Sequence, residues 1–293
     1  HLVIRRQRQM CIRDRCIFAH GWWTVEGQKM SKSLGNVVDP NLLIDEYGRE
    51  PVRYFLLKQI PFGGDGNFSH EDFMVRFNAD LANDYGNLGH RSLSMVGKWC
   101  GGVVPALDEP TERDQELAAL ATRTLAEYTE QIEALQFSVA FETLWNLIRA
   151  GNKYVDSEQP WKLNREGDTV RLGGVMRRAL EICRIAAVLM SPVMPDKSAE
   201  MLAKLGLSET RFEKLTSFDG LVEGAALTGY GLLSSDCEGT MQQQLLQRIG
   251  LPALCLSLAS LTLFLLALEP KFRRTFFMRD SRYSFYSCAF QQA

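Results

Sequence analysis

The segment Lys29-Met30-Ser31-Lys32-Ser33 contains two lysines three residues apart, separated and followed by small hydroxyl side chains. Gly35 lies two residues further on, which is typical of a mobile loop. Lysine ammonium groups neutralise the charge that develops on oxygens during transfer at phosphorus, and a loop that closes on the productive complex stabilises the transition state selectively. These residue types and spacings favour a polyphosphate-binding loop. The alternative interpretation is a solvated Lys/Ser turn.

The elements around this loop follow from the apolar pattern and from turn residues. Residues 17–28 are expected to form a strand from Ile17 to Trp23 followed by a turn. Asp39 can cap a helix, and Pro51 can begin the next one. The Gly-rich stretch 61–67 is the clearest joint in the chain.

A series of long helices is predicted after the joint. The first begins after Ser69 and has apolar residues at helical spacing, namely Phe73, Phe77, Leu81, Leu88, Met95 and Trp99. A polar stripe on the same helix is expected to face outward: Asp80, Asp84, Asn87, Arg91, Ser94 and Lys98. Further amphipathic helices are expected within residues 117–135, 141–155 and 176–190. Four or more helices with short connections form a bundle, so the predicted fold is mainly α.

Composition excludes several classes of protein. The chain has 293 residues, enough for about two domains. With 46% hydrophobic and 23% charged residues it lies in the globular range rather than the disordered one. Seven scattered cysteines without a C-x-x-C pair indicate neither a disulfide framework nor a zinc knuckle, and no metal site is expected.

The two ends differ from the middle. Residues 1–16 carry five arginines against one aspartate and are expected to be extraneous or unassigned. Residues 231–293 form an unassigned tail with an uncharged apolar run at 249–268, close to the roughly 20 residues that cross a bilayer. Gly250 and Pro252 within that run argue against a membrane helix, so a membrane partner is not expected.

The loop and the segments after it resemble the methionyl-tRNA synthetases, a family of class I aminoacyl-tRNA synthetases. Residues 29–33 are similar to the KMSKS signature of the class, and residues 34–40 are similar to its continuation in synthetases for several amino acids. The segments that single out the methionine family are Arg53-Tyr54-Phe55-Leu56-Leu57, Asn78-Ala79-Asp80-Leu81-Ala82-Asn83, Gly86-Asn87-Leu88-x-x-Arg91 and Pro160-Trp161-Lys162-Leu163. The resemblance is continuous from about Phe18 to Leu205.

The resemblance implies a fold and an activity. Residues 17–67 would form the C-terminal end of a Rossmann-like class I catalytic domain, with the KMSKS loop and stem-contact helices, and residues 68–230 an α-helical anticodon-binding domain. The implied reaction is methionine–tRNA ligation: ATP-dependent activation of methionine, with Mg²⁺ accompanying the nucleotide, and transfer to tRNA(Met). The family's His-x-Gly-His element does not occur in this sequence, so the chain alone is not expected to activate methionine.

The resemblance also assigns roles to individual residues. Lys29 and Lys32 would act catalytically on the pyrophosphate side, and the remaining ATP-binding residues would be His20, Met30, Ser31 and Ser33. Family members recognise the first base of the CAU anticodon with an asparagine and an arginine one helical turn apart and with the tryptophan of a Pro-Trp pair. Those positions correspond to Asn87, Arg91 and Trp161. Without a family, a solvated helix face and a core tryptophan are the alternatives.

Two other classes of protein remain open at this stage. One is a non-catalytic tRNA-binding protein derived from a synthetase, which a His-x-Gly-His element upstream in the gene would exclude. The other is a membrane-anchored helical protein, which carbonate extraction of the full chain would identify. For the synthetase itself, the expected partners are tRNA(Met), methionine and ATP. The expected location is the bacterial cytoplasm or the mitochondrial matrix.

Overall fold

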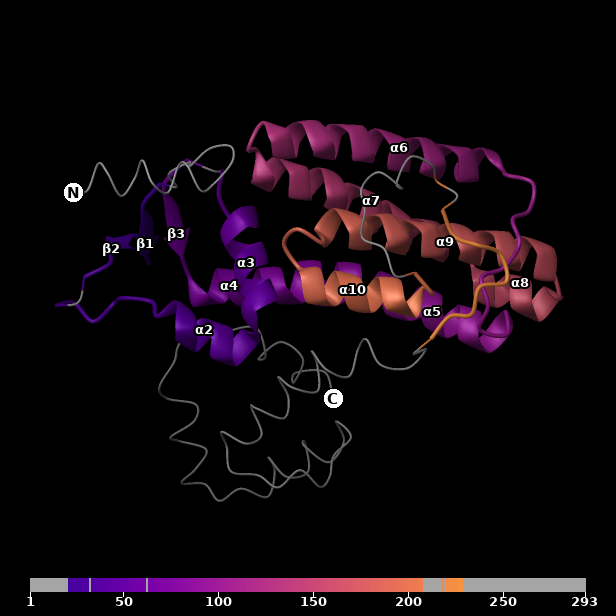
Figure 1. Ribbon diagram of the computed structural model, residues 1–293, viewed down its shortest axis with the longest axis horizontal. Coiled ribbons are helices and arrows are strands. Elements are labelled where there is room, and N and C mark those ends of the chain that lie inside the picture. The colour runs from indigo at the N-terminus through magenta and orange to yellow at the C-terminus, as the bar shows by residue number, and fades with distance from the viewer. Residues whose placement is uncertain (1–20, 32, 62, 208–217, 219, 229–293) are drawn as a thin grey trace, which may run out of the picture. The chain divides into compact units, whose positions relative to one another are not determined.

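A computed structural model describes residues 21–31, 33–61, 63–207, 218 and 220–228 (Figure 1). The chain divides into two compact units, His1–Gly239 and Thr240–Ala293, and all the described residues belong to the first. His20, Lys32, both chain ends and the apolar run at 249–268 lie outside the described residues. Among the helices that are described, none is both long and apolar enough to cross a membrane. The predicted mainly α fold is confirmed.

A small sheet precedes the helices. Its strands are β1 (Trp23–Val25), β2 (Gln28–Lys29) and β3 (Gly66–Phe68), in the order β2-β1-β3. β1 is antiparallel to β2 and parallel to β3. The two residues between β1 and β2, Glu26 and Gly27, both have positive φ, as a tight hairpin turn requires. The sequence pattern predicted a strand from Ile17 to Trp23; residues 17–20 lie outside the described part, Gly21 and Trp22 are not in a strand, and β1 begins only at Trp23.

Two helices follow the KMSKS-like loop. α2 (Pro40–Tyr47) begins after Asp39, whose side chain accepts a hydrogen bond from the Asn41 amide, as predicted. α3 (Arg49–Lys58) begins two residues before Pro51. α3, β3 and the first turns of the next helix enclose a small apolar core formed by Val52, Phe55, Phe68 and Phe73.

The long helix after the joint has three parts. α4 (His70–Arg76), capped by Ser69, leads into a π-helical segment η1 (Phe77–Gly86) and then into α5 (Asn87–Trp99). The sequence pattern predicted one uninterrupted α-helix. Asp84 of the π segment is held from α7 (Phe137–Glu158), where Arg149 contacts its carboxylate and Asn152 donates to its carbonyl.

The predicted outward stripe is wrong at Asp80. Asp80 is only 3% exposed, and its carboxylate accepts a hydrogen bond of 2.8 Å from the Tyr54 hydroxyl of α3. Asp80 follows the buried Phe73 by seven residues, close to two full α-helical turns, so helical spacing itself places it on the buried side. Lys98, further along the helix, is exposed as expected.

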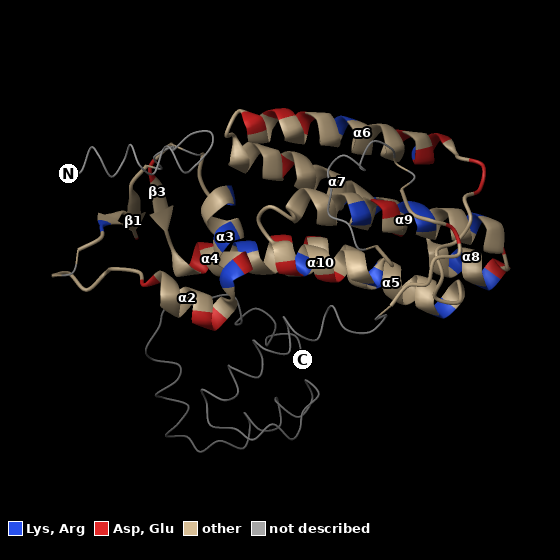
Figure 2. Cartoon of the chain, in the orientation of Figure 1, with Lys and Arg blue, Asp and Glu red and all other residues tan. Residues whose placement is uncertain are grey.

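The remaining helices form the bundle (Figure 1). They are α6 (Glu112–Glu133), α7, α8 (Pro160–Glu166), α9 (Thr169–Met190) and α10 (Pro195–Lys204). Every residue of α9 from Leu172 to Met190 is buried, although this helix carries both basic and acidic residues (Figure 2). Trp145 and Phe141 of α7 are completely enclosed in the same large core. The apolar stripes predicted for these helices therefore do form the core.

α3 is fastened to the bundle by polar contacts. Glu50, itself 5% exposed, accepts hydrogen bonds from the backbone amides of Asp196 (2.5 Å) and Lys197 (3.0 Å) at the start of α10. At the other end of α3 the buried Lys58 pairs with Glu142 of α7 at 2.5 Å, and this hydrogen bond is the main cause that lowers the Glu142 pKa. The segment that carries the loop is thus tied to two helices of the bundle.

We predict that Glu50→Ala lowers the free energy of unfolding by about 2 kcal/mol, because two amide donors at a helix N-terminus lose a charged acceptor. The matched control is Arg49→Ala, which removes only an exposed ion pair with Asp196 and should cost under about 0.5 kcal/mol. Urea denaturation of both variants measures the difference. Equal effects would show that the Glu50 cap does not stabilise the fold.

Candidate functional site

The KMSKS-like loop is closed by the side chain of Asn36. Its amide oxygen accepts a hydrogen bond from the Ser31 backbone at 2.7 Å, and its amide nitrogen donates to the Lys29 carbonyl at 3.1 Å. The hydroxyls of Ser31 and Ser33 are hydrogen-bonded to each other at 2.7 Å. Asn36 therefore bridges the loop as a backbone segment would, and each serine hydroxyl has a partner that an anion could replace.

Lys29 lies at the edge of the sheet. It is exposed, and its Nζ is 5.9 Å from the centroid of the Trp22 ring, within the range of a cation–π contact. Trp22 is 76% exposed, and its backbone amide donates to Asp65. The ammonium group thus remains accessible to a charged ligand, while Met30 and Ser31 beside it are half-buried.

Asn87 and Arg91 occupy the first two turns of α5, and both are half-buried. Arg91 Nη2 lies 2.5 Å from the Asp156 carboxylate in the last turn of α7. The Asp156 side chain is 59% exposed, so the pair faces solvent on one side. Arg91 is therefore not simply solvated: it connects α5 to the end of α7.

Trp161 is the second residue of α8 and is 36% exposed. The core-tryptophan interpretation does not describe this position. Its neighbour Pro160 is buried, and Leu163 packs against the large core. Trp161 follows Asp156 by five residues, across the corner between α7 and α8. The Arg91–Asp156 pair therefore connects α5 to the α7 side of this corner. In Figure 1 this end of the bundle lies away from the sheet and the KMSKS-like loop.

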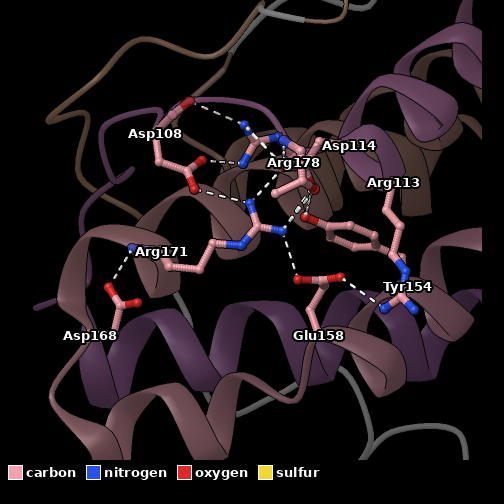
Figure 3. A network of polar contacts seen from close by, with 9 residues as sticks. Asp108, Arg113, Asp114, Tyr154, Glu158, Asp168, Arg171 and Arg178 are labelled. Atoms are coloured by element: carbon pink, nitrogen blue, oxygen red, sulfur yellow. Dashed lines mark hydrogen bonds and ion pairs between the residues drawn. The ribbon is translucent and has the colours of Figure 1, made fainter.

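A buried polar network adjoins this corner, and the sequence patterns did not reveal it (Figure 3). Its centre is the Arg171 guanidinium of α9, which donates to Asp114 of α6 at 2.6 Å, Glu158 of α7 at 2.6 Å and Asp108 at 3.0 Å. Tyr154 of α7 donates to the other oxygen of Asp114 at 2.6 Å. The network therefore joins α6, α7, α9 and the segment that leads into α6.

The network fixes the ionisation of its members. Burial by itself would raise the pKa of Asp114, but hydrogen bonds from Arg171 and Tyr154 outweigh it and hold that pKa far below its ordinary value. Burial, followed by the hydrogen bond to Asp114, raises the pKa of Tyr154. In the sequence, this network was indicated only by a charged residue within an otherwise apolar helix. Such a residue is buried with the helix, and a buried charge requires a partner.

We predict that Asn36→Ala makes the chain more sensitive to trypsin at Lys29. Two hydrogen bonds across the loop are lost, each worth roughly 1 kcal/mol, so local opening and cleavage should increase about thirtyfold. Mass spectrometry of a trypsin time course measures the cleavage. Asn41→Ala is the control, since that side chain contacts only the exposed Asp39 carboxylate. Equal cleavage of the two variants would rule out the bridge.

We predict that Asp114→Asn lowers the free energy of unfolding by about 3 kcal/mol at pH 7, because Arg171 loses a buried charged partner. The Asp114 pKa is depressed in the folded state, so the stabilisation is complete above the ordinary aspartate pKa of about 4 and is lost as pH falls below it. The difference between wild type and variant should therefore narrow between pH 4 and pH 2. Urea denaturation of wild type and variant across this pH range measures that difference. The control is Asp45→Asn, because Asp45 is exposed.

Two family models match the chain. One, described as "tRNA synthetases class I (M)", matches residues 7–93, and the other, "Anticodon binding domain of methionyl tRNA ligase", matches residues 104–237. Among curated proteins, the methionine–tRNA ligase of Listeria innocua is 44% identical over 211 residues, which cover 71% of this chain and 32% of that protein. The Mycobacterium leprae enzyme is 46% identical over 198 residues, covering 67% and 37%. The chain thus spans about a third of the length of these relatives.

Solved structures give the same result. Methionyl-tRNA synthetase of Mycobacterium tuberculosis in complex with methionyl-adenylate has a TM-score of 0.67 and 41% identity, covering 73% of this chain and 43% of that one. The apo form of the same enzyme has a TM-score of 0.66 and 37% identity, covering 73% and 42%. Motifs, fold and relatives agree, and the chain belongs to the methionyl-tRNA synthetase family of class I aminoacyl-tRNA synthetases.

Proposed function

We propose that this chain supplies the KMSKS loop and the anticodon recognition of a methionine–tRNA ligase. Residues 17–67 are assigned to the end of the catalytic domain and residues 68–230 to the anticodon-binding domain. The observation that carries the proposal is the Arg91–Asp156 pair, which holds α5 against the end of α7, five residues before the exposed Trp161. A donor-rich face beside an accessible aromatic ring is the arrangement that recognises a splayed single-stranded base.

At the other end of the chain, Lys29 and Lys32 are assigned to the pyrophosphate side of ATP. Their charge would oppose the negative charge that develops as methionine's carboxylate attacks the α-phosphate. Ser31 and Ser33 would exchange their mutual hydrogen bond for phosphate oxygens, and Met30 and His20 would lie near the adenylate. The exposed Lys29 ammonium and the paired serine hydroxyls support this assignment.

Magnesium would be bound through the nucleotide rather than by a protein cluster. The described residues contain no group of three or more His, Cys, Asp or Glu side chains that could hold a metal ion. Mg²⁺ is commonly held by substrate phosphates with few protein ligands. The described residues are therefore compatible with an ion that is bound through the nucleotide. The ion would neutralise phosphate charge during activation.

In the anticodon site, Trp161 would stack on the first base, and Arg91 would donate to its Watson–Crick edge. Cytosine presents acceptors at N3 and O2, whereas uracil presents an N–H donor at N3, so a guanidinium donor favours cytosine. Arg91 pairs with Asp156 in the free chain, so binding would redirect part of its donor set toward the base. Asn87, one turn earlier, would contribute a second hydrogen bond.

We predict that the full chain binds an anticodon stem-loop with CAU more tightly than the same hairpin with UAU. Trp161→Ala should weaken binding of the CAU hairpin about tenfold, because base stacking contributes roughly 1–3 kcal/mol. Arg91→Ala should abolish the preference for cytosine, and Asn87→Ala should reduce it. Fluorescence anisotropy of labelled hairpins measures all four proteins.

Two control variants test whether these effects are local. Trp22→Ala removes a more exposed tryptophan just before β1, and Arg123→Ala removes an exposed arginine from α6, whose partner is Glu127. Both should bind like the wild type. Equal affinity of the wild type for the two hairpins, or discrimination that survives Arg91→Ala, would refute the proposed anticodon role.

A further inference from the structure

The residues between α7 and α9 form a short excursion from the bundle that carries Trp161. α7 ends at Glu158, and Gln159 has left-handed backbone geometry (φ 48°), so the chain turns sharply into α8. Gly167, with φ 78°, turns it again after α8, and α9 begins at Thr169. The position of α8 therefore depends on two turns and on what holds them.

α8 itself has few contacts with the core. Pro160 is buried and Leu163 half-buried, whereas its other five residues are exposed. A helix of two turns with so little buried surface is weakly held by its own packing. The orientation of Trp161 must therefore be set mainly at the base of the excursion.

Both ends of the excursion are attached to one residue of α9. The Glu158 carboxylate, just before the first turn, lies 2.6 Å from Arg171 Nη2. Asp168, just after the second turn, accepts a hydrogen bond of 3.0 Å from the Arg171 backbone amide. Arg171 therefore closes the base of the excursion with its side chain on one side and its backbone on the other (Figure 3).

Arg171 is in turn immobilised from other elements. Its guanidinium is also bound by Asp114 and Asp108, of which Asp114 is 1% exposed on its side chain. Arg178, about two turns further along α9, contacts the same two carboxylates. The side chains of Arg171 and Glu158 are only 16% and 13% exposed, so their ion pair is little screened by water.

We propose that Arg171 and Glu158 are positioning residues for anticodon recognition, whose ion pair holds the α7–α8 corner so that Trp161 faces the base. This inference rests on the proposed function, because it assigns Trp161 the stacking role. Neither residue contacts the base: each acts through the ring, and Asp114 and Asp108 act through Arg171.

The first test observes the ring in the free protein. The full chain is labelled with 5-fluorotryptophan, and the ¹⁹F resonance of Trp161 is assigned from Trp161→Phe. Glu158→Ala should shift or broaden that resonance while leaving the resonance of the completely buried Trp145 in place. Glu158→Gln, which keeps a hydrogen-bond acceptor for Arg171, should give a spectrum close to that of the wild type.

The second test is a double-mutant cycle with the CAU and UAU hairpins. Glu158→Ala should weaken binding of the CAU hairpin about tenfold in the wild-type background and should have no further effect in Trp161→Ala. A general loss of structure would instead weaken both backgrounds. The control is Arg113→Ala, which removes only the outer contact of Glu158, at 3.4 Å from an arginine that is 66% exposed, and which should change neither readout.

The outcomes separate this inference from the function on which it rests. A wild type that prefers CAU, with both the affinity for the CAU hairpin and the Trp161 resonance unchanged in Glu158→Ala, overturns the positioning role alone. A wild type without any preference overturns the proposed function and the inference with it. If Glu158→Ala does not fold, Arg171→Lys replaces it: this variant keeps the charge but lacks the fork that binds several carboxylates, and it should weaken binding of the CAU hairpin to the same extent.

Discussion

The burial of α9 is the constraint on which the rest of the structure depends. A helix enclosed from Leu172 to Met190 must be surrounded on every side, and it contains ionisable residues whose charges cannot be left without partners in the interior. Arg177 donates to the carbonyls of Pro105 and Leu221, so the segments before α6 and after α10, which also pair with each other through Val103 and Ala226, are drawn against the helix. The irregular connections are therefore as much a part of the core as the helices are.

The same constraint shapes the connection after α10. Glu181 accepts a hydrogen bond from the Leu221 amide at 2.6 Å and also binds Arg184 at 2.7 Å. Gly220 lies so close to this pair that a Cβ there would be 2.3 Å from the Arg184 guanidinium carbon, which is closer than a side chain permits. Arg171 extends this arrangement to the outer end of α9, where satisfying its charge also fixes the corner that carries the proposed stacking ring. Under the proposed function, stability and recognition would share one set of contacts.

Local features of the fold could be predicted from sequence, and contacts between distant segments could not. The cap at Ser69 and the apolar stripes depend on neighbours a few residues away, so spacing reveals them. The buried partner of Asp80 is Tyr54 of another helix, and the network of Arg171 pairs residues 13 to 63 positions apart in sequence. The motifs identified Trp161 as a candidate, but only the structure shows that it is exposed and that Arg91 is paired with Asp156. Only the structure reveals that Asn36 closes the KMSKS-like loop.

The π segment has a consequence for how chain length can vary in this part of the molecule. Wider turns accommodate an additional residue relative to an α-helix of the same rise, so η1 behaves like a single-residue insertion that has been absorbed without a bulging loop. Removing one residue between Phe77 and Gly86 would let the segment return to α-helical winding while the residues after it keep nearly the same angular position, because the wide turns already take up the extra residue. Arg91 would then still lie on the side of α5 that pairs with Asp156 of α7. The same deletion inside a regular α-helix would rotate everything after it by about 100° about the helix axis. This part of the long helix is therefore where the chain can change its length with the least effect on the pairing of α5 with α7.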